Sequence, residues 1–225
     1  MAKIRLTAYF CLSVLFYSMT PKMAVKKHTY LALGDSYTIG ESVPARENFP
    51  SLTVQQLNNT GLSFDKAEII AKTGWTTDEL QNAIDKAKPE SSFDIVSLLI
   101  GVNNQYRGRP VEEYAGQFEV LLKQAIVFAG NEPSRVFVLS IPDWGITPFA
   151  EGRNRKAISR EIDAYNEVNR SIAQKYNVHY IDITPGTREA AGDKSLLAGD
   201  GLHPSGKEYA RWAEKLALQI GTLIY

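Results

Sequence analysis

Five short apolar runs, separated by longer segments with helical periodicity, constrain the fold of this chain most strongly. The runs cover 29–33, 67–71, 93–100, 135–141 and 178–183, and several are continuous and rich in Ile, Val and Leu. Such runs are typical of strands that are buried on both faces. Because strands that alternate with helices form parallel sheets with right-handed crossovers, the sequence predicts one α/β domain with helices on both faces of the sheet.

The helical segments are indicated by their starts and by their apolar stripes. The predicted helices are 49–59, 76–88 and three segments that begin at Val111, Ala157 and Pro204. Pro50 stands at the start of the first, where proline is favoured, and Thr76 and Glu79 have capping-box spacing in the second. A start at Pro204 would make His203 the N-cap of the last helix, where the helix dipole disfavours an imidazolium.

The composition limits the classes of partner and cofactor. The 225 residues carry 25 basic and 25 acidic side chains, so no large net field would gather a nucleic acid or another polyanion. Cys11 is the only cysteine and there are three histidines. The chain beyond the N-terminal segment therefore holds neither a disulfide nor a thiolate metal site, and we expect no metal and no cofactor.

The N-terminus resembles an export signal. Lys3 and Arg5 precede a mostly apolar stretch from Leu6 to Met19, whose 14 residues fall short of the roughly 20 that a membrane-spanning helix needs. We therefore expect a signal peptide over 1–24, a catalytic domain over 25–225, an exported protein and no stable membrane span after signal removal. The alternatives are an uncleaved anchor, or translation from Met23 that would leave the protein cytoplasmic.

Three residues at opposite ends of the domain can supply a nucleophilic serine site. Ser36 follows the first apolar run, and Asp200 and His203 lie three residues apart near the last helix. A serine hydroxyl needs a neutral imidazole to take its proton, and a carboxylate to orient that imidazole and stabilise its cation. The sequence predicts that Ser36, His203 and Asp200 meet at the carboxyl edge of the sheet.

Two further segments follow neighbouring runs and should reach the same edge. Gly74 comes after the second run and Asn103 after the third. A glycine can bring its backbone N–H close to a ligand, and an asparagine can offer a carboxamide N–H. Taken singly, each is also a common turn residue.

Together these segments resemble the four blocks of the SGNH (GDSL-type) hydrolase family. The blocks are 34–37, Gly74, 101–104 and 200–203, in the family's order. The resemblance implies a three-layer α/β/α flavodoxin-like sandwich with five parallel strands. It implies Ser36 as nucleophile, His203 as base and then acid, and Asp200 as the orienting carboxylate. The oxyanion hole would consist of the Ser36 and Gly74 N–H groups and the Asn103 side chain.

Two positions depart from the family pattern: Tyr37 stands where leucine is commonest, and Asn104 where aspartate is usual. Asn104 is no triad member, so activity should survive, although the hydrogen bonds that hold its neighbour must differ.

An apolar loop over 143–154 is a candidate pocket wall, or else packs on the core. The residues expected around the leaving group are Asn104, Tyr106, Arg107, Asp143 and Trp144.

The implied activity is hydrolysis of small-molecule carboxylic esters through an acyl-enzyme, with short-chain or lysophospholipid-like esters as the first substrate hypothesis. Carbohydrate O-acetyl esters come second, and thioesters or aryl esters third. An exposed Trp144 would favour a sugar, whereas an apolar groove from Trp144 to Phe149 would favour an acyl chain. The alternative from another class is a flavodoxin-like binding module with an inert serine. The sequence does not indicate an oligomeric state.

Overall fold

The computed structural model describes residues 27–90 and 92–224. The expected signal segment over 1–24 lies outside these residues, so export stays a sequence-based prediction. None of the helices within the described ranges is long and apolar enough to cross a bilayer.

Five parallel strands form one sheet in the order β2-β1-β3-β4-β5, which confirms the predicted fold class. They are β1 (Tyr30–Asp35), β2 (Glu68–Lys72), β3 (Ile95–Leu99), β4 (Val136–Leu139) and β5 (His179–Ile181). Strands β3, β4 and β5 lie inside predicted runs, β2 is shifted by one residue, and β1 extends two residues past its run. The order is the doubly wound, flavodoxin-like one, in which ligands bind outside the carboxyl ends of the strands.

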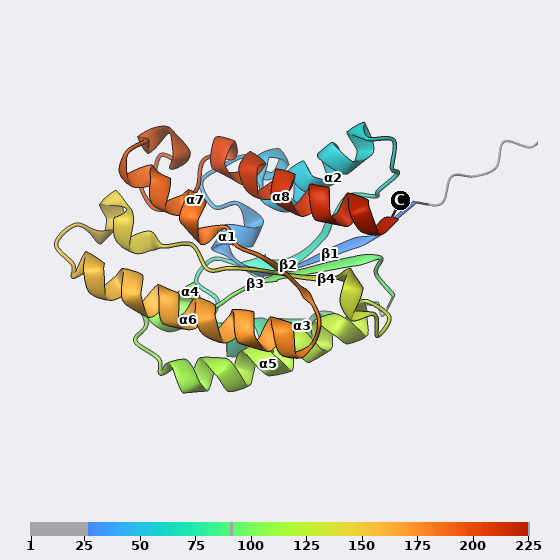
Figure 1. Ribbon diagram of the computed structural model, residues 1–225, viewed down its shortest axis with the longest axis horizontal. Helices are drawn as coiled ribbons and strands as arrows, with labels where there is room; N and C mark the ends of the chain where they lie inside the picture. Colours follow the sequence, from blue (N-terminus) through green and yellow to red (C-terminus); the bar gives the residue numbers. More distant parts are fainter. Residues whose placement is uncertain (1–26, 91, 225) are drawn as a thin grey trace, which may run out of the picture.

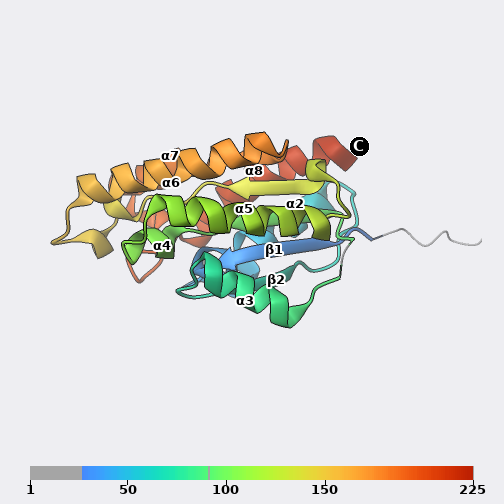
Figure 2. The same ribbon diagram turned by 90° about the horizontal axis from the view of Figure 1, so that it is seen from below.

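The helices make two outer layers (Figure 1). On one face α2 (Phe49–Asn59) packs against α8 (Gly206–Ile224); the other face carries α3 (Thr77–Ala87), α5 (Val111–Phe128) and α6 (Arg155–Lys175). Short helices α1 (Ser36–Ile39), α4 (Val102–Tyr106) and α7 (Thr184–Arg188) follow β1, β3 and β5. The arrows of β1 and β4 in Figure 2 point the same way, so the segments that follow the strands share one edge.

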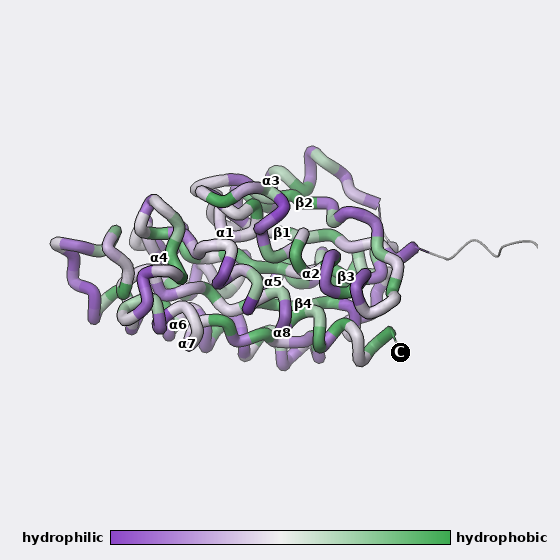
Figure 3. The backbone as a smooth tube through the Cα atoms, turned by 90° about the horizontal axis from the view of Figure 1, so that it is seen from above, coloured by the Kyte–Doolittle hydropathy of each residue, from purple (hydrophilic) through white to green (hydrophobic). Residues whose placement is uncertain are grey.

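Hydrophobic burial explains this layering. Every residue of β1, β3 and β4 is buried, and the tube in Figure 3 is green along the central strands and purple at many outer turns. The predicted stripe of α5 faces the sheet, with Tyr114, Phe118 and Leu121 fully buried. Apolar surface removed from water contributes roughly 25 cal/mol per Å², which makes these stripes the main source of stability.

The start of the last helix was predicted wrongly. Helix α8 begins at Gly206, and Pro204 instead forms an isolated antiparallel bridge with Leu197. Ser205 comes directly before the helix, and its carbonyl accepts the N–H of Tyr209 at 2.9 Å. His203 is therefore outside the helix, and the expected N-cap effect on its imidazolium does not apply.

A close approach of backbone segments fixes the turn after β1. A Cβ atom on Gly34 would lie 2.1 Å from Thr38 Oγ1 and 2.5 Å from the carbonyl oxygen of Leu99. Any side chain at this position would therefore push α1 away from β3. The glycine lets the first turn of α1 lie against the end of the neighbouring strand.

Candidate active site

A cavity of about 180 Å³ opens at the carboxyl edge of the sheet. It is lined by Ser36, Tyr37, Thr73, Gly74, Val102, Asn103, Tyr106, Trp144, Phe149, Leu202 and His203. The nucleophile, base and oxyanion-hole residues expected from the sequence thus converge on one space, although they come from four separate segments.

Ser36 is the first residue of α1, immediately after β1 ends at Asp35. The residue is 4% exposed, and its hydroxyl makes no hydrogen bond to any described residue. The hydroxyl is therefore free to meet a ligand or an imidazole within the cavity. Its backbone N–H lies at the start of a helical turn, where N–H groups lack partners within the helix.

Asp200 holds the imidazole of His203 through a network of hydrogen bonds. His203 Nδ1 lies 2.6 Å from Asp200 Oδ2, and Asp200 Oδ1 accepts the backbone N–H groups of Leu202 and His203, each at 3.0 Å. The Ser42 hydroxyl also donates to Oδ2, at 2.7 Å. Partial burial opposes ionisation of Asp200, but these hydrogen bonds outweigh it and lower its pKa to about 2. The carboxylate is thus charged and fixed, and Nε2 is left as the free ring nitrogen.

Gly74 and Asn103 are held in place from behind the cavity. Gly74 has a φ of +82°, which glycine adopts without strain, and its carbonyl accepts Arg107 Nη2 at 2.6 Å. Asn103 Nδ2 donates to the Trp75 carbonyl at 2.9 Å and lies 3.5 Å from Asp35 Oδ2. Since a carbonyl can only accept, the Trp75 contact fixes which end of the carboxamide carries the donors. The 3.5 Å contact to Asp35 is the weaker of the two hydrogen bonds, so its hydrogen is the one for which a ligand in the cavity can compete.

Residues 32–211 match the model of the GDSL-like lipase/acylhydrolase family. The chain belongs to this family. The sequence-based assignment to GDSL-type hydrolases is therefore confirmed. None of the curated proteins compared matches the chain.

Solved structures of two esterases and of a lipase/acylhydrolase share the fold. The acetylxylan esterase Axe2 from Geobacillus stearothermophilus has a TM-score of 0.67 at 20% identity, over 88% of this chain and 97% of Axe2. A psychrotrophic esterase, EstA from Pseudoalteromonas sp., has a TM-score of 0.63 at 17% identity, over 88% of this chain and 99% of EstA. The lipase/acylhydrolase from Enterococcus faecalis has a TM-score of 0.64 at 22% identity, over 87% of this chain and 96% of that structure.

Two of the five residues expected around the leaving group, Tyr106 and Trp144, do line the cavity of this GDSL-like protein. With Phe149 they form an aromatic wall, in which the Trp144 ring lies 5.3 Å from Tyr106 and 6.0 Å from Phe149. Trp144 is 3% exposed and its Nε1 donates to Gln105 Oε1 at 2.7 Å. Tyr106 and Phe149 are each 42% exposed and form the outer edge of the wall.

Asn104 and Arg107 are not among the residues that line the cavity. Asn104 is fully buried, accepts the N–H of Thr77 at 3.1 Å and donates to its hydroxyl at 2.7 Å. Arg107 forms an ion pair with Glu79 at 3.3 Å besides its bond to Gly74. Both side chains are therefore engaged in holding the loops that carry Gly74 and Asn103.

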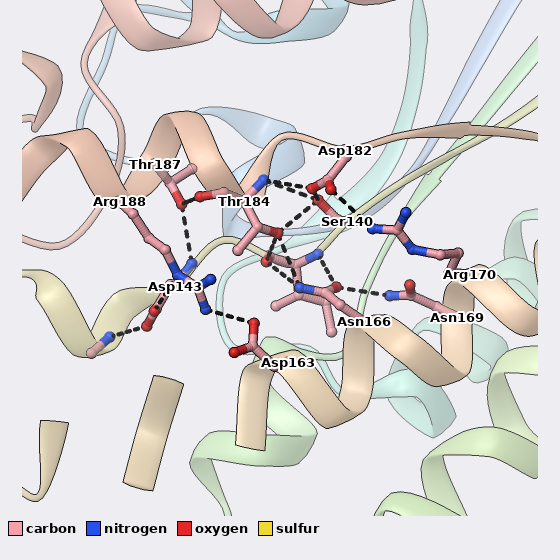
Figure 4. Close-up of polar contacts among 12 residues, drawn as sticks. Ser140, Asp143, Asp163, Asn166, Asn169, Arg170, Asp182, Thr184, Thr187 and Arg188 are labelled. Atoms are coloured by element: carbon pink, nitrogen blue, oxygen red, sulfur yellow. Dashed lines mark hydrogen bonds and ion pairs between the residues drawn. The ribbon is translucent and has the colours of Figure 1, made fainter. Parts of the chain in front are cut away.

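Asp143 also lies outside the main cavity, in a polar network beneath α7 (Figure 4). Its carboxylate is paired with Arg188 Nε at 2.9 Å, and Arg188 reaches Asp163 of α6 at 2.6 Å. In the same network Asn166 accepts the N–H of Ile141 at 2.7 Å and donates to its carbonyl at 2.9 Å. These contacts fix the chain where it leaves β4, just before the aromatic wall begins.

A buried carboxyl group directly precedes Ser36 in the chain. Asp35 is fully buried, and its Oδ1 accepts the N–H of Tyr37 at 3.0 Å. Burial raises the pKa of Asp35 to about 7, and the Tyr37 hydrogen bond offsets only part of that effect. The residue contributes to the site by capping α1 and by its contact with Asn103.

Sequence reasoning missed Ser42, Thr73, Val102 and Leu202 as parts of the site. Thr73, Val102 and Leu202 are direct neighbours of predicted site residues, so proximity to the blocks was a usable signal. Ser42 carried none, because it is an isolated serine in a turn, and only the folded chain brings it to Asp200.

Proposed function

We propose that this GDSL-like protein is a serine esterase that hydrolyses short-chain carboxylic esters through an acyl-enzyme on Ser36. The observation that carries the proposal is the convergence on one cavity of a free serine hydroxyl, an imidazole fixed by an ionised carboxylate, and the three residues that would supply the oxyanion donors. A binding module has no need of that combination.

In the proposed mechanism Ser36 Oγ bonds to the ester carbonyl carbon while His203 Nε2 takes the hydroxyl proton. The Asp200 carboxylate stabilises the imidazolium, and the Ser36 N–H, the Gly74 N–H and Asn103 Nδ2 stabilise the oxyanion. Collapse of the intermediate breaks the bond to the alcohol, which leaves with the proton from His203. A water, deprotonated by the same imidazole, then releases the acid and regenerates Ser36.

The size and lining of the cavity favour a short acyl group. A cavity of about 150 Å³ can hold benzene, so about 180 Å³ accommodates a few carbons rather than a long chain. Trp144 is buried and presents no free polar edge, because its Nε1 is bonded to Gln105. This arrangement matches the condition under which an acyl chain was favoured over a sugar.

Hydrolysis of carbohydrate O-acetyl groups is the second candidate, and one observation favours it. Tyr106 and Phe149 expose their rings at the outer edge of the aromatic wall, where a sugar ring could stack while its acetyl group enters the cavity. The similar structure Axe2 is an acetylxylan esterase.

The test is a rate series on 4-nitrophenyl esters from acetate to octanoate, with acetylated xylose beside them. We expect the highest kcat/KM at two to about four carbons, and labelling by a fluorophosphonate that Ser36→Ala abolishes. Ser171→Ala, an exposed serine on α6, is the matched control and should keep both properties. Persistent labelling of Ser36→Ala, or no labelling of the parent protein, would refute the esterase proposal. A preference for acetylated xylose would instead support the second candidate.

The role of Asn103 has its own test. Removing one oxyanion donor typically costs about 100- to 1,000-fold in kcat. We therefore expect Asn103→Ala to lose kcat in that range while its fluorescence-monitored unfolding stays cooperative. An unchanged kcat would remove Asn103 from the oxyanion hole.

A further inference from the structure

An arginine lies against the aromatic wall of the cavity. Arg153 belongs to the turn between the 3-10 helix Pro148–Ala150 and α6. Its guanidinium carbon lies 5.0 Å from the ring centre of Tyr106, 5.3 Å from that of Trp144 and 5.7 Å from that of Phe149. All three rings line the cavity. One cation therefore contacts the whole wall, at a distance where the attraction between a cation and an aromatic face is significant.

The guanidinium has hydrogen-bonding capacity to spare. Arginine carries five N–H donors in a planar fork. Among the described residues the Arg153 side chain uses only one hydrogen bond, from Nη2 to the Tyr106 hydroxyl at 3.1 Å. The side chain is exposed, so the other donors face solvent at the outer edge of the wall.

The charge of Arg153 is not balanced by a protein carboxylate within residues 27–90 and 92–224. Other arginines near the cavity are paired: Arg107 with Glu79 and Arg188 with Asp143. Glu151, two residues before Arg153, forms no ion pair with it.

Further basic side chains extend this positive charge away from the wall. Arg155, Lys156 and Arg160 on the first turns of α6 line a neighbouring surface hollow, and no described carboxylate pairs with any of them. The turn that carries Arg153 and the start of α6 lie at the far left end of Figures 1 and 3. The tube in Figure 3 is coloured as hydrophilic there.

We propose that Arg153 is a specificity-determining residue that selects esters carrying a carboxylate or phosphate group just beyond the aromatic wall. The inference rests on the proposed esterase function. The cavity accommodates only a short group, so the remainder of a substrate leaves it past Tyr106 and Phe149 and reaches the free donors of Arg153. A guanidinium binds either anion through two parallel hydrogen bonds, and such charge-assisted bonds are the strong ones.

A merely structural role makes a different prediction. If Arg153 only holds the rings of the wall, its loss should affect neutral and anionic esters alike. If it binds an anion, its loss should affect only the anionic member of a matched pair. Arg153→Lys keeps the charge but loses the planar fork, so it should retain part of the preference.

The experiment compares kcat/KM for matched esters in the full-length protein. The acyl pair is mono-4-nitrophenyl glutarate and 4-nitrophenyl valerate. The alcohol pair is 3-acetoxybenzoate and its methyl ester, with 3-acetoxyphenyl phosphate as the phosphate probe. We expect Arg153→Gln to lower kcat/KM about ten-fold for the anionic esters of the acyl set, of the alcohol set or of both. For the neutral esters of both sets it should lower kcat/KM by less than about two-fold. One charge-assisted hydrogen bond is sufficient for that ratio.

The matched control is Arg135→Gln, an exposed arginine just before β4 at the opposite edge of the sheet, which contacts none of the three rings and should behave like the parent protein. Equal losses on both members of each pair, or no loss on any, would overturn the inference. Both outcomes leave hydrolysis of the neutral esters in place, so they are distinguishable from failure of the esterase proposal, in which the parent protein hydrolyses none of the probes.

Discussion

At the scale of single residues, the carboxylate of the proposed triad, Asp200, is held by a neighbour that is 158 positions away in sequence. Ser42 donates its hydroxyl to Asp200 Oδ2, the oxygen that also holds His203. To do so Ser42 adopts a φ of +66°, a conformation that costs a side chain energy and that glycine adopts freely. A strained backbone at a hydrogen bond to the carboxylate of the proposed triad is expected where the contact serves the reaction rather than stability.

Ser42→Gly separates these two effects. It removes the hydroxyl and relieves the backbone strain, so we expect kcat to fall about ten-fold with KM nearly unchanged. A hydrogen bond to a charged group contributes roughly 1.5–3 kcal/mol. Relief of the positive φ should offset part of the stability lost with this hydrogen bond, so the melting temperature should fall less in Ser42→Gly than in Ser42→Ala. Steady-state kinetics and calorimetry measure both quantities. Ser42→Ala should lose the same activity and more stability. Full activity in both variants would show that Asp200 is held without Ser42.

At the scale of elements, α4 is tied to the start of α3 by one buried side chain. Asn104 makes both of its hydrogen bonds to Thr77, so the loop after β3 cannot move independently of the loop after β2. These are the loops that carry Asn103 and Gly74. The asparagine at this position, where the family usually has aspartate, is neutral and satisfies both a backbone donor and a hydroxyl.

Asn104→Ala should therefore destabilise the protein, whereas the same substitution at the neighbouring Asn103 should destabilise it far less. The substitution leaves the N–H of Thr77 buried without its partner, which costs about 1–3 kcal/mol. Urea unfolding measures this loss. The neighbouring variant Asn103→Ala is the comparison, since it should lose far more activity and far less stability. If the two variants lost stability equally, Asn104 would not be the tie between the helices.

Elements and motifs were predictable from the sequence to different extents. Apolar runs and stripes placed the strands, and 49–59 coincides with α2, because burial and periodicity are local signals. The start of α8 was misplaced since Pro204 suits a first helical turn but is also compatible with an extended bridge. Arg107 and Asp143 were assigned to the pocket because their partners, Glu79 and Arg188, lie on other elements. No local pattern identifies such pairs.

At the scale of the whole molecule, stability should depend on pH through one buried carboxyl group. The chain has no formal net charge at pH 7, so general charge repulsion contributes little near neutrality. Hydrogen bonds from His203 and other groups overcome partial burial and lower the pKa of Asp200 to about 2, and its contribution to stability is lost only as pH falls below about 4. Burial raises the pKa of Asp35 to about 7, and burial also raises that of Glu208.

The sign for Asp35 follows from proton binding. Between pH 4 and pH 7 the folded state keeps the Asp35 proton that the unfolded state has released, so raising the pH destabilises the folded protein. Asp35→Asn cannot ionise, yet its carbonyl oxygen can still accept the Tyr37 N–H. The variant should therefore gain stability relative to the parent protein, by roughly 2–3 kcal/mol more at pH 8 than at pH 5.

Urea unfolding of the two proteins at a series of pH values measures this difference, and the contribution of Glu208 cancels because both proteins carry it. Parallel stability curves would mean that Asp35 is ionised in the folded state throughout this range. The expected result has a functional meaning as well. A carboxyl group that costs stability at neutral pH, next to Ser36 and 3.5 Å from Asn103 Nδ2, is better explained by its place in the proposed site than by a gain in stability.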